Sequence, residues 1–161
     1  MKKTKPSEKK VGIWLDQEEA YIISLAEEAK LLLERIKSDV ESRIRIRGEG
    51  KVSARFGNAF IDDQEKKQRR QRHQRQRYFN KIIRMISGFD YIYLFGPGKG
   101  KEELNNAIEK EHGFIGKLIT IETTDRLTEN QMIAKTSEFF GSDKFRDLKR
   151  KWRRQLRFAN V

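Results

Sequence analysis

YIYLFGPGKG, at residues 91–100, is the segment most informative about the fold. Its first five residues form an unbroken apolar run, which is typical of a strand buried on both faces. The glycines and the proline in residues 96–100 then predict a tight turn. A buried strand followed by a glycine-rich turn is how many α/β units begin, so we expect a helix directly after it.

The residues after this turn fit that expectation. Residues 101–111 predict a helix with Leu104, Ala107 and Ile108 on one face, and 117–122 predict another strand. Thr128, Glu129, Asn130 and Gln131 then have the form of a capping box that starts a helix ending near Gly141. The strand–helix–strand–helix order implies parallel strand pairing.

Upstream, the chain begins with a predicted hairpin. The apolar run 11–16 and the run 20–25 each indicate a strand, and the polar residues between them form a short loop. Residues 26–40 are ambiguous: the 3-4-3-4 spacing of their apolar residues favours a helix, whereas LLLERI at 31–36 fits a strand equally well. Residues 42–47 alternate apolar and basic residues like a half-exposed strand, and a long exposed loop is expected over 48–58.

Charge is segregated along the 161 residues, whose formal net charge is +12. Residues 1–10 carry +4, residues 66–84 carry +9 without a single acid, and residues 142–161 carry +6. These segments total +19, which leaves −7 for the remaining residues. Basic segments on an acidic body predict a polyanionic partner, RNA or a ribosome.

Several classes are excluded by composition. The absence of cysteine removes disulfides, thiolate metal sites and cysteine nucleophiles. The longest apolar runs have about five or six residues, far from the roughly 18 of a membrane span. The basic start of the chain lacks the apolar stretch of a signal peptide. We therefore expect a soluble cytoplasmic protein, bacterial in origin, with no membrane partner.

The strongest functional signal is the run QEKKQRRQRHQRQR at residues 64–77. Nearly all of these residues favour helix and none is apolar, while the apolar residues just after them supply a packing stripe. We predict one long helix from about 62 to 87, with its C-terminal half docked on the body and its N-terminal half projecting into solvent. The RNA-binding candidates lie on every side of this helix: Lys66, Lys67, Arg69, Arg70, Arg72, Arg75 and Arg77. A merely solvated helix and a helix on an acidic membrane are the other readings.

The glycine turn at 96–100 is a second candidate site. Backbone N–H groups between a strand and a helix can hold a phosphate, so Gly98, Lys99 and Lys101 are candidate contacts, although a purely structural turn is the simpler reading. The spacing fits neither a Walker loop nor a dinucleotide fingerprint.

Metal chemistry is a weaker candidate. Asp16, Asp90, Glu122 and Asp125 lie at predicted strand ends, where a metal-dependent nuclease would gather its carboxylates. Helix capping explains Glu122 and Asp125 as well. We expect no metal and no cofactor. The two histidines, His73 and His112, are expected to be solvated surface residues.

Several of these segments together resemble the bacterial relatives of the middle domain of eukaryotic and archaeal class-1 peptide-chain release factors, small proteins sometimes labelled translational machinery components. The opening VGIWLD with Ala20 looks like their W-[I/L]-D-x-x-x-A signature, and LFGPG with Leu104 looks like their strand–turn–helix step. Glu122, Asp125 and Thr128 look like their closing segment. The resemblance covers about residues 10–141.

The resemblance implies an α/β, ribonuclease-H-like mixed sheet of about five strands flanked by helices, with an N-terminal antiparallel meander followed by a parallel β-α-β unit. That meander favours a strand at about 31–38 over the helix. The implied organisation is a basic disordered tail at 1–10, a single domain at 11–141 and a basic C-terminal tail or helix at 142–161.

The resemblance also implies a role at the ribosome. Release factors place a Gly-Gly-Gln loop ahead of a long helix to promote peptidyl-tRNA hydrolysis; here that place is held by GEGKVSARF, residues 48–56, without Gly-Gly-Gln. Gly50, Lys51, Ser53 and Arg55 are candidate loop contacts. We therefore expect a non-catalytic RNA- or ribosome-binding protein. The alternatives are a hydrolase acting on peptidyl-tRNA, a metal-dependent nuclease, and a protein-interaction domain with basic tails.

Overall fold

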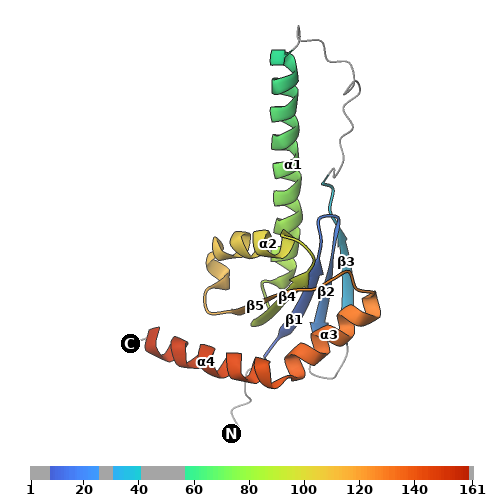
Figure 1. Ribbon diagram of the computed structural model, residues 1–161. Coiled ribbons are helices and arrows are strands. Elements are labelled where there is room, and N and C mark those ends of the chain that lie inside the picture. The colour runs from blue at the N-terminus through green and yellow to red at the C-terminus, as the bar shows by residue number, and fades with distance from the viewer. Residues whose placement is uncertain (1–7, 26–30, 41–56, 160–161) are drawn as a thin grey trace.

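The computed structural model describes residues 8–25, 31–40 and 57–159. Its centre is a five-stranded sheet of order β3-β2-β1-β4-β5, with one long helix standing away from it (Figure 1). The mixed α/β sheet flanked by helices that the resemblance implied is confirmed.

The first three strands form the expected antiparallel meander. They are β1 (Lys10–Leu15), β2 (Glu19–Leu25) and β3 (Leu31–Lys37). Ile13 lies opposite Ile22 in the first pair, and Ile22 lies opposite Glu34 in the second. The helix that apolar spacing favoured over 26–40 is therefore wrong, because 31–37 pairs along the whole of β2. Sheet pairing across the hairpin outweighs a local 3-4 spacing.

The second half of the sheet is parallel. Strand β4 (Tyr91–Gly96) pairs with β1, and β5 (Leu118–Thr123) pairs with β4. Between them lies the predicted helix, α2 (Gly100–Glu109). It is followed by a short 3₁₀ turn, η2 (His112–Phe114), which was not predicted. Strand β4 is buried along its whole length, as its unbroken apolar run indicated.

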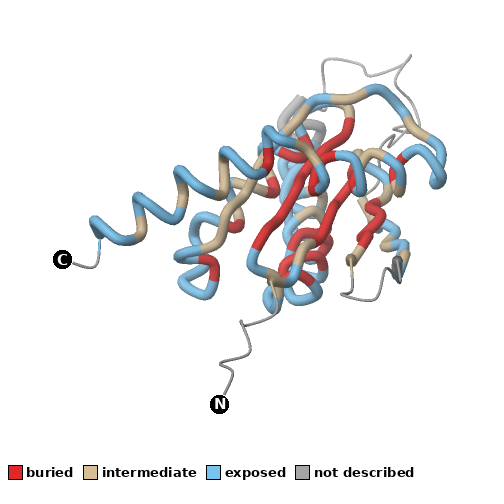
Figure 2. The backbone as a smooth tube through the Cα atoms, turned by 90° about the horizontal axis from the view of Figure 1, so that it is seen from below, coloured by how far each residue is buried: buried red, intermediate tan, exposed pale blue. Residues whose placement is uncertain are grey.

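Helices cover both faces of the sheet. On one face, apolar residues of α1 (Gly57–Ile86) and α2 pack on Ile13, Ile22 and Leu94. On the other face, α3 (Glu129–Gly141) and α4 (Asp143–Ala159) cover Trp14, Tyr93 and Phe95. Figure 2 shows the buried residues concentrated in the central strands and on the sides of the helices that face them.

Two local features fix α3. The predicted capping box is present: Thr128 Oγ1 accepts from the Gln131 N–H at 3.2 Å, and Gln131 Oε1 accepts from the Thr128 N–H at 2.9 Å. The helix lies so close to β1 that a Cβ on Gly12 would lie 2.6 Å from Cγ2 of the buried Thr136. Gly12 therefore sets the distance between helix and sheet.

The structure sharpens the expected helix boundaries in two places. Helix α1 begins at Gly57, so residues 57–58 belong to it and not to the expected loop. The basic segment after Ser142 is a 17-residue helix, α4. The strand expected at 42–47 and the rest of the loop expected at 48–58 lie outside the described residues. None of the helices in the described ranges has a stretch long and apolar enough to span a membrane.

Candidate nucleic-acid interface

Helix α1 has a docked half and a projecting half. The docked half buries five apolar side chains against the sheet and α2: Tyr78, Phe79, Ile82, Ile83 and Ile86. The Tyr78 hydroxyl also donates to the Asp16 carbonyl at 3.4 Å, and burial raises the pKa of Tyr78 well above its usual range. Upstream of these residues the helix rises away from the sheet (Figure 1).

The helix period sorts the seven basic candidates of α1. One side of the helix continues the docked stripe upward through Lys67, Gln71, Gln74 and Arg75, all wholly or partly buried. The remaining candidates are exposed: Lys66, Arg69, Arg70, Arg72 and Arg77. The seven candidates therefore lie on several sides of the helix, and two of them, Lys67 and Arg75, lie on its partly buried side.

Ion pairs divide the candidates further. Arg75 Nη1 lies 3.3 Å from Glu103 Oε2 on α2, and Arg69 lies 3.9 Å from Glu65 one turn earlier. Lys66, Arg70 and Arg77 form no ion pair with any residue in the described parts of the chain. No acid among the described residues neutralises their charges, so they are available to a bound anion.

These cations share a face with polar side chains. A shallow hollow on the helix is lined by Lys66, Arg69, Arg70, His73, Gln76, Arg77 and Asn80. From Lys66 to Asn80 this face extends about 21 Å along the helix axis. It offers Arg and Lys for phosphates, and amide groups for sugars or bases. We call these seven residues the basic face of α1.

The glycine turn lies at the carboxyl end of β4. Gly98 adopts a positive φ of 68°, as its turn requires. Lys101 is only 1% exposed and its ammonium donates to the Gly98 carbonyl, whereas Lys99 is exposed. A phosphate contact by Gly98, Lys99 and Lys101 stays a prediction, and the buried position of Lys101 shows that its side chain also closes the turn.

The carboxylates considered for a nuclease make separate structural contacts. Asp16 Oδ1 accepts from the Glu18 and Glu19 N–H groups at 2.8 Å, and Asp90 Oδ2 accepts from the Lys9 N–H at 3.1 Å. Asp16 follows the carboxyl end of β1, while Asp90 precedes the amino end of the parallel strand β4, so they lie at opposite ends of the sheet. Within the described ranges, no three acidic or histidine side chains gather in a way that could hold a metal ion.

Glu122 forms a network with Tyr93 and Lys135. The Tyr93 hydroxyl donates to its carboxylate, and Lys135 Nζ lies 3.3 Å from Glu122 Oε1. The Tyr93 hydrogen bond lowers the pKa of Glu122, and Lys135 lowers it further. Burial and the same hydrogen bond raise the pKa of Tyr93. These contacts tie β4, β5 and α3 together.

Helix α4 covers the segment that the sequence left open as a tail or a helix. Its apolar row lies toward the body: Phe145 is buried, and Leu148, Trp152 and Leu156 are half-buried. Lys149 and Arg153 pair with Glu8, just before β1. The spacing of Phe145, Leu148 and Trp152 in the sequence was the signal for this helix.

The loop candidates Gly50, Lys51, Ser53 and Arg55 lie outside the described residues. Both histidines are exposed, as expected, and His73 belongs to the basic face of α1.

Comparison with known proteins gives structural likenesses only. No family model matches the chain, and no curated protein matches its sequence. Among solved structures, the Thermoplasma acidophilum Pelota protein is similar with a TM-score of 0.48 and 13% identity, over 88% of this chain and 34% of that one. An archaeal translation termination factor, aRF1, has a TM-score of 0.42 and 14% identity, over 94% and 41% of the two chains. A structure described only as an archaeal protein has a TM-score of 0.41 and 14% identity, over 94% and 40%.

The chain thus spans less than half the length of each of these proteins.

Proposed function

We propose that the protein binds structured RNA of the ribosome through the basic face of α1, in a role related to translation termination or ribosome rescue. One observation carries the proposal: Lys66, Arg70 and Arg77 project from the free half of a helix whose other half is anchored in the core, and no described acid neutralises them. Lys66 and Arg70 are about one helical turn apart, and like charges at this spacing repel one another unless an anion binds between them. The resemblance of residues 10–141 to release-factor middle domains supports the choice of ribosomal RNA.

The amino-acid content of the projecting half favours phosphate contacts over base stacking. From Asp62 to Arg77 there is no Phe, Tyr or Trp, the side chains on which single-stranded bases stack. Guanidinium groups instead hold phosphates in a fixed, two-pronged geometry. A helix with cations on its exposed sides can contact the phosphate backbone of folded RNA at several points.

The protein acts as a binding factor without peptidyl-tRNA hydrolysis of its own, a part of the proposal supported by the lack of Gly-Gly-Gln in residues 48–56. Release of peptide from peptidyl-tRNA on isolated ribosomes tests this part. Release that is lost in Gly50→Ala and Ser53→Ala variants would contradict it.

Sedimentation with ribosomes and direct binding to a ribosomal RNA fragment test the main proposal. The triple variant Lys66→Gln, Arg70→Gln, Arg77→Gln should weaken binding roughly tenfold or more near 0.1 M salt. It should also reduce the slope of log affinity against log salt by about two to three, since each lost phosphate contact removes about 0.7–0.9. The matched control, Lys37→Gln, Lys110→Gln, Arg126→Gln, removes three exposed charges elsewhere. Equal effects of the two triple variants would reject the basic face as the site.

A further inference from the structure

We infer that α4 is a second, separate RNA-binding surface, so that the protein can hold two RNA segments at opposite ends of an acidic body. This inference rests on the proposed function of α1 and extends it. The sequence placed eight Lys and Arg and two Asp in this helix, a net +6. The structure shows which of those charges are free to bind.

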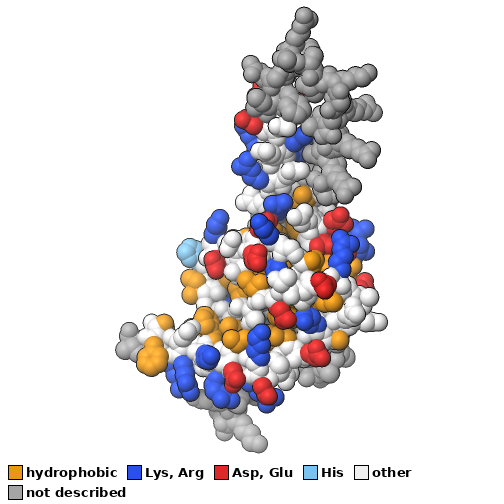
Figure 3. Space-filling view, viewed as in Figure 1, with side chains coloured by type: hydrophobic (Ala, Val, Ile, Leu, Met, Phe, Trp, Pro, Cys, Tyr) orange, Lys and Arg blue, Asp and Glu red, His pale blue; other side chains and the backbone are white. Residues whose placement is uncertain are grey.

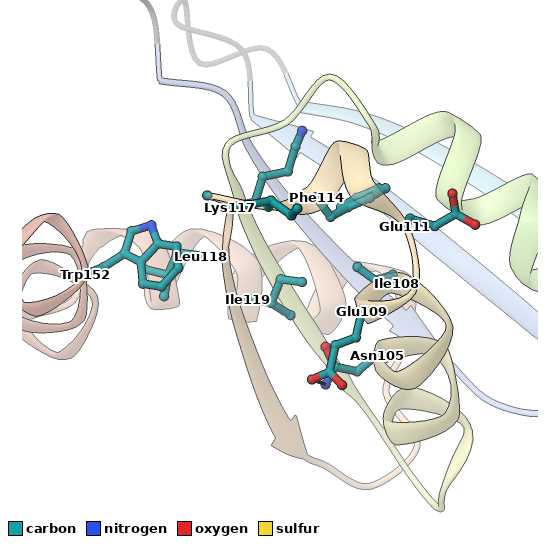
Figure 4. A pocket seen from close by; sticks show the side chains of 11 residues that line it. Asn105, Ile108, Glu109, Glu111, Phe114, Lys117, Leu118, Ile119 and Trp152 are labelled. Atoms are coloured by element: carbon teal, nitrogen blue, oxygen red, sulfur yellow. Dashed lines mark hydrogen bonds between the residues drawn. The ribbon is translucent and has the colours of Figure 1, made fainter. Parts of the chain in front are cut away.

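The apolar side of α4 packs against the body of the protein. Phe145 makes edge-on contacts with Tyr91 and Phe140, at centroid distances of 5.3 and 5.0 Å. Trp152 lies beside Leu118 at the amino end of β5, where both line a groove of about 450 Å³ (Figure 4). Because the apolar row faces the body, the helix presents its basic side to solvent.

The basic side of α4 is poorly neutralised. Asp143 and Asp147 pair with Arg146 and Arg150, at 3.1 and 4.0 Å. Lys151, Arg154 and Arg157 are exposed and form no ion pair within the described ranges. They lie in the last two and a half turns, where the helix extends past the edge of the sheet (Figure 1). A polyanion fits this surface better than an apolar peptide, because most of its exposed side chains are cations, with Gln155, Phe158 and Ala159 beside them.

Two basic surfaces are separated by acidic residues. The basic face of α1 and the free end of α4 lie at opposite ends of the molecule (Figure 1), and Figure 3 shows Lys and Arg gathered along both. Residues 88–141, which link the two helices, contain nine acidic and six basic residues. Asp and Glu side chains lie on the visible surface between the two (Figure 3), so we expect two RNA segments, and not one short RNA, to fill both surfaces.

Simultaneous binding has a measurable consequence. When two sites engage one large partner, the second contact is intramolecular, and the gain in affinity reaches 10²–10⁴-fold where geometry permits. A large folded RNA should therefore bind far more tightly than a short hairpin, and loss of either surface should reduce its affinity toward that of the hairpin.

The test uses short RNA hairpins, half carrying a donor dye and half an acceptor, mixed with the full chain. The wild type should bind two hairpins by sedimentation equilibrium and give energy transfer between them. The α4 variant Lys151→Gln, Arg154→Gln, Arg157→Gln and the α1 variant Lys66→Gln, Arg70→Gln, Arg77→Gln should each bind one hairpin and give no transfer. The control Lys37→Gln, Lys110→Gln, Arg126→Gln should behave like the wild type.

The outcomes separate this inference from the proposed function. One hairpin per wild-type molecule, lost in the α1 variant and unaffected in the α4 variant, overturns the role of α4 and leaves that of α1 intact. Binding lost only in the α4 variant overturns the proposed function of α1 and the two-surface arrangement together. A third outcome is that RNA is held by α1 alone, while poly-glutamate binds the wild type but not the α4 variant. This result would assign α4 to an acidic protein and overturn the inference.

Discussion

Arg75 on α1 pairs with Glu103 on α2, with 3.3 Å between Nη1 and Oε2, about one turn upstream of Tyr78, the first residue of the docked stripe. This pair uses one of the arginines that sequence reasoning assigned to RNA. Both side chains are about 40% exposed, so the pair stabilises the fold only slightly.

The pair leads to a contrast between two arginines of the same helix. Arg75→Gln should change the free energy of unfolding by less than about 1 kcal/mol and alter RNA affinity little, because its charge is already neutralised. Arg70→Gln should leave stability unchanged and weaken RNA binding several-fold. Chemical denaturation and RNA titration of the two variants check both statements. An Arg75→Gln variant with the larger loss of affinity would contradict the assignment.

Gly12 should tolerate no larger residue. A Cβ there would overlap the Thr136 side chain, so Gly12→Ala should destabilise the protein by about 1–3 kcal/mol through displacement of α3 from β1. Adding Thr136→Ala removes the overlapping methyl and hydroxyl and should restore part of the loss. Denaturation of the single and double variants measures this coupling; strictly additive effects would show that the two residues do not compete for space.

Glu122 should make stability depend on acid pH. Its pKa in the folded protein is lowered from 4.5, so its stabilising effect is complete above that value and is lost as the pH falls through the folded-state pKa. The difference in unfolding free energy between the wild type and Glu122→Gln should therefore shrink from about pH 7 to about pH 3. Glu102→Gln, on the exposed side of α2, is the control. A difference that is constant with pH would mean that the Tyr93 hydrogen bond does not favour the charged carboxylate.

Phe145 should anchor α4. Phe145→Ala removes a ring that is 2% exposed, and the cost should be about 3–5 kcal/mol, with faster amide exchange in α4. Phe158→Ala, near the end of the same helix, removes a ring that is 81% exposed and should change stability by less than about 0.5 kcal/mol. Equal amide exchange in the two variants would show that α4 does not depend on this contact.

Much of the fold could be predicted because several of its elements carry clear local sequence signals. The unbroken apolar run of β4 and the capping box of α3 are local signals, and the structure has both. Strand β3 was harder, because LLLERI satisfies two periods at once and only its pairing with β2 decides between them. The resemblance to release-factor domains supplied that pairing, which apolar spacing could not.

The candidate site was predictable in composition but not in detail. The position and length of α1 follow from helix-forming residues ahead of a packing stripe. Which cations remain free depends on partners far along the chain, such as Glu103 for Arg75 and Glu8 for Arg153. Such long-range pairs leave no trace in local sequence, so the structure was needed to separate cations used by the fold from cations available to a ligand.

The docking of α1 has a mechanical consequence. Among the described residues, the apolar packing of α1 lies at one end of a long helix, so a tilt there is amplified along the basic face, which extends about 21 Å from its lowest to its highest residue. A tilt of about 10° at the docked stripe would move the far end of that face by about 4 Å. A shift of that size exceeds the length of a hydrogen bond and would break a contact between a cation and a phosphate. The packing of Ile82 and Phe79 therefore sets the direction of the helix as well as its attachment to the sheet. Changes of shape in this part of the core will misdirect the cations even where the protein remains fully folded.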